Sequence, residues 1–163
     1  MVKRTPADNW FSKCIRIRSN WTCEYCNVSF EHNKSQLHCS HFISRGYLAT
    51  RYHPKNALAH CQQCHEKLGG GRWGGGNVAE FAEHYDSVFS STDREIMRQL
   101  AQAQFRKHKQ HLSYISKHYR TEHKAMEAAR AEGCQDRLEF PLYNGVLELI
   151  GYEEQLRKEL NVD

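Results

Sequence analysis

Apolar residues recur at every third or fourth position in several stretches of the chain, and this spacing is typical of helices with one buried face. These stretches are residues 7–19, 77–89, 92 to about 108, and 112–132. Polar residues that cap helices stand near their starts, namely Thr5 or Asp8, Asn77 and Thr92, and Gly133 follows the last stretch. The pattern predicts a largely helical chain, with a further apolar cluster near its end whose form the spacing leaves open.

Two short segments between the first two stretches have extended rather than helical character. Residues 36–43 (QLHCSHFI) are similar to a short strand, and residues 44–46 (SRG) would form its turn. A second extended segment is expected over residues 56–60, and residues 61–69 follow it as a short helix. Glycine-rich residues 69–76 (GGGRWGGG) then separate this part of the chain from the later helices.

Length and composition favour one α+β domain with a thin core. The 163 residues are 39% hydrophobic and the mean hydropathy is −0.80, so a bound metal or partner should help to stabilise the fold. We expect a core in residues 1–76 and a helical extension in residues 77–163 that packs on the core or dimerises beside it. No segment approaches the ~18 apolar residues that span a bilayer and no secretory signal is visible, so we expect a cytoplasmic protein.

Charge is unevenly distributed along the chain. The net charge is +4, but residues 1–72 contain 11 Lys and Arg against 4 Asp and Glu, whereas the remainder contains 12 against 15. A basic half beside a mildly acidic half suggests that the first half faces a polyanion such as nucleic acid. Ordinary variation of surface charge is the alternative.

Four of the seven cysteines form two CxxC pairs, Cys23 with Cys26 and Cys61 with Cys64. Four thiolates at this spacing suit the closed tetrahedral sulfur shell of structural zinc, and a reducing compartment would keep them from forming disulfides. The alternative is two unrelated thiol pairs. A redox role is disfavoured because no βαβ pattern surrounds either pair. The other cysteines are interpreted as buried thiols.

Three polar residues with catalytic potential lie in and beside the two predicted strands. His41 ends the first, Asn56 opens the second, and His65 follows the last zinc cysteine at the start of the short helix. This order can gather all three around one phosphate. Phosphodiester hydrolysis needs a base, a cation and a fixed orientation of the base, and each requirement has a candidate here.

The chain resembles the HNH (ββα-metal) endonucleases, and more narrowly the lambdoid-phage NinG (Rap) recombination nucleases. The segments that carry the resemblance are ADNWFSKCIRIRSNWTCEYC, LHCSHFISRG and RYHPKNALAHCQQCHEKLGGG. The resemblance implies a core held by zinc, with His41 as general base, Asn56 orienting it and His65 binding a catalytic Mg²⁺, Mn²⁺ or other divalent transition ion. The resemblance covers roughly residues 7–77.

This sequence departs from the family pattern beside the base. Many HNH enzymes carry an acidic metal ligand where this chain has Ser40, and NinG-like proteins carry an aspartate where it has His38. The side chains of residues 38 and 40 lie on the same face of the strand, so either could bind the same ion. We predict His38 as the second ligand of the catalytic ion. Each histidine could instead be a surface or core group, and Asn56 could serve only the turn.

Basic residues near the predicted site could bind DNA phosphates. They are Arg45, Arg51, Lys55, Lys67 and Arg72. We therefore expect a DNA endonuclease, which by resemblance would act on branched or recombination-intermediate DNA. A non-catalytic zinc module that binds nucleic acid is the first alternative, and a zinc-stabilised protein-interaction domain is the second.

Overall fold

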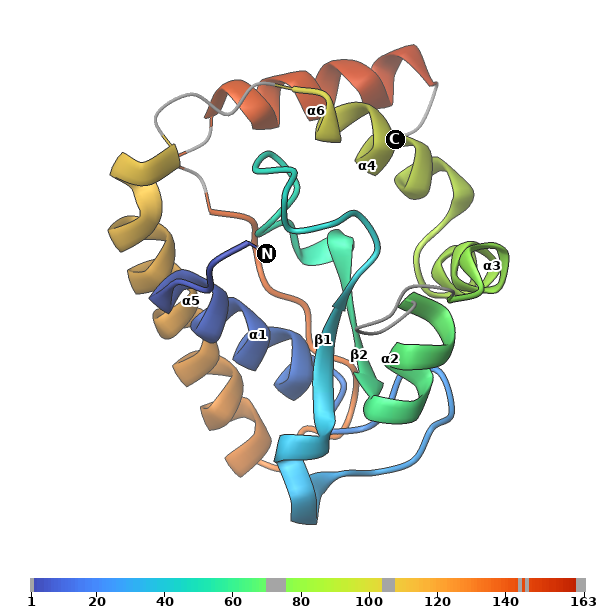
Figure 1. Ribbon diagram of the computed structural model, residues 1–163. Helices are drawn as coiled ribbons and strands as arrows, with labels where there is room; N and C mark the ends of the chain where they lie inside the picture. Colours follow the sequence, from blue (N-terminus) through green and yellow to red (C-terminus); the bar gives the residue numbers. More distant parts are fainter. Residues whose placement is uncertain (1, 70–75, 104–107, 144, 146, 161–163) are drawn as a thin grey trace.

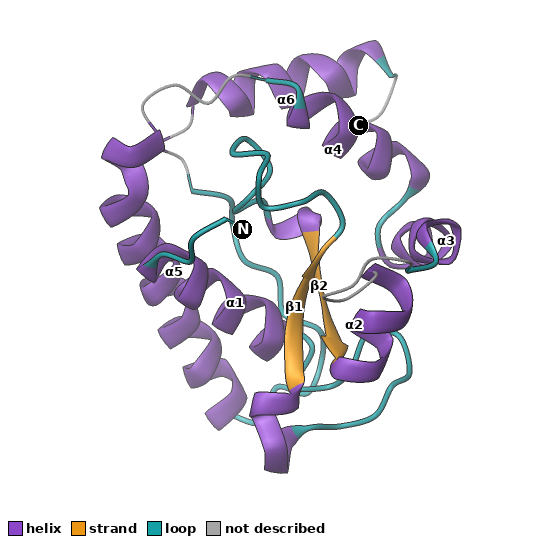
Figure 2. Cartoon of the chain, in the orientation of Figure 1, coloured by secondary structure: helices purple, strands orange, loops and turns teal. Residues whose placement is uncertain are grey.

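The computed structural model describes residues 2–69, 76–103, 108–143, 145 and 147–160 (Figure 1). The fold is α+β, as predicted, with one two-stranded antiparallel sheet and otherwise helices in the described ranges (Figure 2). Its elements are α1 Pro6–Arg18, η1 Glu31–Gln36, β1 Leu37–His41, η2 Pro54–Asn56, β2 Ala57–Cys61, α2 Gln62–Gly69, α3 Val78–Val88, α4 Ser91–Ala101, α5 His108–Ala131 and α6 Leu147–Glu159.

Helix α1 begins at a capping box. The hydroxyl oxygen of Thr5 accepts a hydrogen bond from the backbone N–H of Asp8, and the carboxylate of Asp8 accepts one from the backbone N–H of Thr5. Pro6 at the first helical position needs no hydrogen-bond partner for its nitrogen. The helix buries Phe11 and Ile15 against the sheet and α5, which confirms the predicted amphipathic helix.

The two strands form a hairpin with a long connection, and α2 follows β2 directly. In the register of the sheet, His38 lies opposite His60 and His41 lies opposite Ala57. Helices α1 and α2 both contact the sheet, and Figure 1 shows them on opposite sides of it. The chain order β1, β2, α2 therefore brings one end of the hairpin next to the start of a helix.

Two of the later helix starts test the predicted caps. Asn77 caps α3, because its side chain accepts a hydrogen bond from the N–H of Glu80. Helix α4 is capped by Ser90 rather than by Thr92, because Ser90 has an extended backbone and accepts from the N–H of Asp93. This helix ends at Ala101, well before the expected end near residue 108.

Helix α5 lies beside α1 and contributes to the main core (Figure 1). Tyr119 is fully buried, makes an edge-to-face contact with Phe11, and its carbonyl accepts a hydrogen bond from the thiol of Cys14. Ile115 and Met126 belong to the same apolar cluster as α1 and the sheet. The later helices thus pack on the part of the chain that carries the cysteine pairs.

A second apolar cluster joins α4 to α6 and the loop of the hairpin. Ion pairs reinforce it at its edge: Asp93 of α4 contacts Lys55 at 2.8 Å and Arg157 of α6 at 2.9 Å. His53 of the hairpin loop contacts Glu153 of α6 at 3.0 Å. In the described part of the chain, no helix has the length and apolar character needed to cross a membrane.

Candidate metal centre and histidine-lined cavity

The four cysteines of the CxxC pairs lie together. Their sulfur atoms are all within 4.8 Å of one another, and the sulfurs of Cys26 and Cys61 are 4.0 Å apart. A zinc ion with Zn–S bonds of ~2.3 Å would give a tetrahedron with edges of about 3.8 Å. The donor set and its dimensions therefore fit a structural zinc ion, with Cys23 and Cys64 completing the tetrahedron.

Tight turns of the backbone bring the first pair into position. Asn27, next to Cys26, has a left-handed backbone with φ of 58°, a conformation that asparagine tolerates better than most residues. The N–H of Asn27 donates to the carbonyl of Cys23, and the N–H of Cys61 donates to the sulfur of Cys23 at 3.3 Å. The last contact links the first pair directly to the end of β2.

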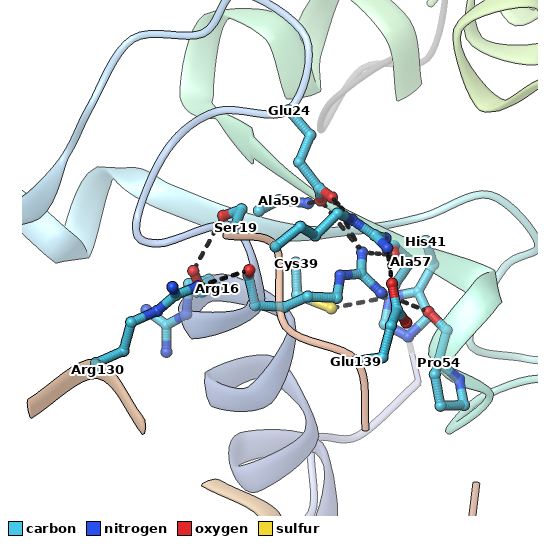
Figure 3. A network of polar contacts seen from close by, with 12 residues as sticks. Arg16, Ser19, Glu24, Cys39, His41, Pro54, Ala57, Ala59, Arg130 and Glu139 are labelled. Carbon is cyan, nitrogen blue, oxygen red and sulfur yellow. Dashed lines mark hydrogen bonds and ion pairs between the residues drawn. The ribbon is translucent and has the colours of Figure 1, made fainter. Parts of the chain in front are cut away.

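A buried ion pair links the loop that contains Cys23 and Cys26 to the rest of the core. Arg18 at the end of α1 is fully buried and contacts the carboxylate of Glu24 at 3.1 Å. Glu24 also accepts from the N–H of Ala59 in β2 (Figure 3). Arg18 donates to the carbonyl oxygens of Pro54 and Ala57. Burial raises the pKa of Glu24, but the charge of Arg18 and the N–H of Ala59 outweigh it, so the net pKa is lowered.

A cavity of about 600 Å³ lies beside the hairpin and the start of α2, and three of the predicted histidines line it. They are His38 and His41 of β1 and His65 of α2. All three side chains are half-buried. The structure therefore brings together, on one cavity, side chains that are up to 27 positions apart in the sequence.

His41 is held in one tautomer by the backbone of the hairpin loop. Its Nε2 lies 3.0 Å from the carbonyl oxygen of Arg51, and because a carbonyl only accepts, Nε2 must carry the proton. Nδ1 is then the basic nitrogen, with the Cys39 sulfur 3.9 Å away (Figure 3). Burial lowers the pKa of His41 to about 4, so the ring is neutral near pH 7.

Asn56 hydrogen-bonds to the loop that contacts the ring of His41. Its side chain is completely buried, and its amide nitrogen donates to the carbonyl oxygens of Ile43 at 3.0 Å and Thr50 at 2.9 Å. Its oxygen accepts from the N–H of Ile43 at 2.8 Å. Asn56 thus closes the loop between residues 43 and 50, and the next carbonyl, that of Arg51, orients His41.

The ring of His38 in β1 faces the ring of His65 in α2. Their rings are nearly parallel, with an interplanar angle of 15° and centroids 5.5 Å apart. Burial lowers the pKa of both, helped by the charges of Arg16 and Arg4 for His38 and by His38 for His65. Two neutral imidazoles that border one cavity suit a divalent transition ion. Ser40 is buried, with 1% of its surface exposed.

Arginines from three separate segments of the chain line the same cavity. They are Arg4 before α1, Arg45 in the hairpin loop and Arg98 of α4. Of these, only Arg45 was predicted. Arg4 precedes the predicted site by more than thirty residues and Arg98 follows it by more than thirty, so neither stands out in the sequence. The positive lining suits a phosphate group.

The other predicted DNA contacts have different surroundings. Arg51 is only 4% exposed and binds the carboxylate of Asp8 through two nitrogens, at 2.9 and 2.7 Å, so its guanidinium is buried and paired inside the protein. Lys55 pairs with Asp93, and Lys67, which is 54% exposed, pairs with Glu80. Arg72 lies outside the described residues.

Comparisons with known proteins leave the family open. A scan of protein-family models found no match to this chain, and searches of curated proteins and of solved structures found no match either.

Proposed function

We propose that this chain is a metal-dependent DNA endonuclease of the HNH class, with a zinc ion bound by the four clustered cysteines. The observation that carries the proposal is the shared cavity of His38, His41 and His65, which arginines line on several sides. The resemblance of the sequence to HNH enzymes supports the same conclusion. A phosphodiester is the substrate because it matches both the positive lining and the available base.

In the proposed reaction, Nδ1 of His41 accepts a proton from a water molecule as the water oxygen attacks phosphorus. The bond between phosphorus and the 3′ oxygen breaks, and the leaving oxygen takes a proton from solvent. The products are a 5′-phosphate and a 3′-hydroxyl. The carbonyl of Arg51 stabilises the Nε2 proton throughout, and Asn56 fixes that carbonyl by closing the loop.

His38 and His65 would hold the catalytic divalent ion, which supplies positive charge for the phosphate and the leaving oxygen when bound. Arg45 and Arg98 would bind the phosphate oxygens that flank the cleaved bond. The clustered cysteines would contribute indirectly, by positioning His65. Cys64 directly precedes His65 in α2, so a zinc ion bound by the cysteines would fix the start of that helix.

The experiment is nicking of supercoiled plasmid with Mg²⁺, Mn²⁺ or Ni²⁺ and with EDTA. His41→Ala should slow cleavage by about 10²–10⁴-fold at saturating ion, because a general base contributes on this order. His38→Ala should instead raise the ion concentration needed for half-maximal rate. His32→Ala is the matched control, because His32 is exposed on η1 and lines neither the cavity nor the cysteine cluster.

Absence of cleavage by the wild-type chain with every ion would refute the enzyme proposal and favour the non-catalytic zinc module. Equal nicking by His41→Ala and the wild type would remove His41 from the mechanism. A panel of linear duplex, flap, D-loop and four-way junction substrates then tests the proposed preference for branched DNA. Equal rates on all four would contradict that preference.

A further inference from the structure

A second cavity, of about 540 Å³, adjoins the histidine-lined cavity. Both are bordered by Arg4, Ser12, His38 and Cys39, so the two spaces meet beside β1. The second space extends along α1 rather than toward α2 and is called the α1 groove below. Neither the sequence pattern nor the proposed reaction assigns it a role.

One face of α1 forms the wall of the α1 groove. Pro6, Asn9, Lys13 and Arg16 are spaced by three or four residues and therefore lie along one side of the helix. From residue 6 to residue 16 the helix rises by about 15 Å. This length corresponds to about four base-pair steps of 3.4 Å along the helix axis of B-form DNA.

The charges of the α1 groove are positive. Arg4, Lys13 and Arg16 line it, and no carboxylate is among its lining residues in the described part of the chain. The side chain of Arg4 is exposed and that of Lys13 is half-buried, and no ion pair with a carboxylate is found for either among the described residues. Arg16 is held in place by hydrogen bonds to the carbonyl oxygens of Ser12 and Lys34.

Aromatic surface in the α1 groove is covered by cations. The ammonium of Lys13 lies 4.1 Å from the centroid of the Trp10 ring, and the guanidinium of Arg120 lies 5.7 Å from it. His123 makes an edge contact with the same ring. A base would have to displace these groups to stack on Trp10, whereas a phosphate could approach the cations directly. The groove therefore suits a sugar-phosphate backbone rather than an unpaired base.

We propose that the α1 groove binds the sugar-phosphate backbone of the substrate strand next to the cleaved bond, through Arg4, Lys13 and Arg16. The inference rests on the proposed nuclease function, because the groove and the histidine-lined cavity share His38 as a lining residue. A strand held along α1 would enter that cavity from the side of His38 and leave His41 on the far side of the scissile phosphate. The contact reads no base sequence and contributes affinity that depends on salt.

The test is binding of fluorescein-labelled oligothymidylate, measured by fluorescence anisotropy without added divalent ions over a range of salt concentrations. The double variant Arg4→Gln/Lys13→Gln should bind about tenfold or more weakly at low salt. If two phosphate contacts are lost, the slope of log K against log salt should become shallower by about 1.4 for a single strand. Lys109→Gln/Lys158→Gln is the matched control, because it removes the same charge from exposed lysines of α5 and α6 that line neither cavity.

The proposal requires the control to bind like the wild type. Equal loss in both double variants would mean that net charge alone governs binding, and unchanged affinity in Arg4→Gln/Lys13→Gln would mean that DNA does not use the α1 groove. Either result overturns the inference. Circular dichroism of each variant checks that α1 is intact. Plasmid nicking by the wild type is measured separately, so failure of the nuclease proposal and failure of the groove proposal are distinguishable.

Discussion

Replacing Asn56 with Asp changes one buried atom from a hydrogen-bond donor to an acceptor. The Asn56 amide nitrogen donates to the carbonyl oxygens of Ile43 and Thr50, at 3.0 and 2.9 Å. In Asn56→Asp an ionised carboxylate oxygen would face both carbonyl oxygens. The N–H of Ile43, 2.8 Å from Oδ1, would keep its acceptor. The perturbation therefore removes two hydrogen bonds without changing the size of the side chain.

The expected loss follows from those two bonds. The Ile43 carbonyl would be left without a donor, at a cost of ~1–3 kcal/mol. The Thr50 carbonyl would keep its hydrogen bond from the N–H of His53 at 3.0 Å and lose only its second one, at a cost of ~0.5–1.5 kcal/mol, so the free energy of unfolding should fall by about 1.5–4.5 kcal/mol. For a chain of this size, 1 kcal/mol corresponds to about 2–4 °C in Tm, so Tm should fall by at least ~3 °C. Cleavage should slow as well, because the loop that Asn56 closes presents the Arg51 carbonyl to His41.

Urea unfolding of Asn56→Asp at several pH values measures this effect. Burial beside two carbonyl oxygens should raise the pKa of the introduced carboxyl above its ordinary ~3.9. The neutral form, present in acid, can donate one hydrogen bond, so the loss of stability should be smaller near pH 5 than near pH 8.

Asn33→Asp is the control for the added charge, because Asn33 is exposed and its Oδ1 accepts a bond from Ser35 that aspartate can also accept. If Asn56→Asp were as stable and active as Asn33→Asp at pH 8, the loop would not depend on Asn56 and the assigned role would be wrong.

Three further predictions concern zinc, the general base and the buried ion pair. Elemental analysis should find one tightly bound zinc per chain, and Cys61→Ser should lower both zinc content and Tm; a native protein without zinc would contradict the cysteine assignment. The acid limb of kcat/KM should lie near pH 4 rather than near neutrality, because burial lowers the pKa of His41 to about 4 and the ring must be neutral to accept a proton. A limb near pH 6.5 would mean that burial does not control this group. Glu24→Gln should cost about 3 kcal/mol or more in unfolding free energy, since it leaves the fully buried charge of Arg18 without its carboxylate; denaturation at the wild-type midpoint would show that the pair contributes nothing.

Local patterns in the sequence were sufficient to predict several parts of the structure. Two CxxC pairs predicted a four-cysteine cluster, because chemistry that requires four thiolates leaves a recognisable spacing. The hydrophobic period predicted α1 over residues 7–19, and the structure has it at Pro6–Arg18. Alternation and turn residues predicted the two strands that became β1 and β2. The helical period, the strand alternation and each CxxC pair depend on residues close together in the chain.

The ion-pair partners of the charged residues could not be predicted from the sequence, because the two partners can be far apart in the chain. Arg51 was expected to contact DNA, but Asp8, which lies 43 positions away, binds it in the interior. Arg98 was not expected at the cavity, since it comes from a helix far along the chain. Opposite charges attract through space, so their partners follow from the fold and not from the order of residues.

The sequence by itself determined the types of the main elements, the cysteine cluster and the candidate histidines, because these depend on residue type and short-range spacing. Only the tertiary structure decided that α5 packs on α1, that His38, His41 and His65 border one cavity, and that the α1 groove shares lining residues with it. These arrangements require segments distant in the chain to bury apolar surface against one another. Burial depends on the whole set of packed side chains, so no local pattern specifies it.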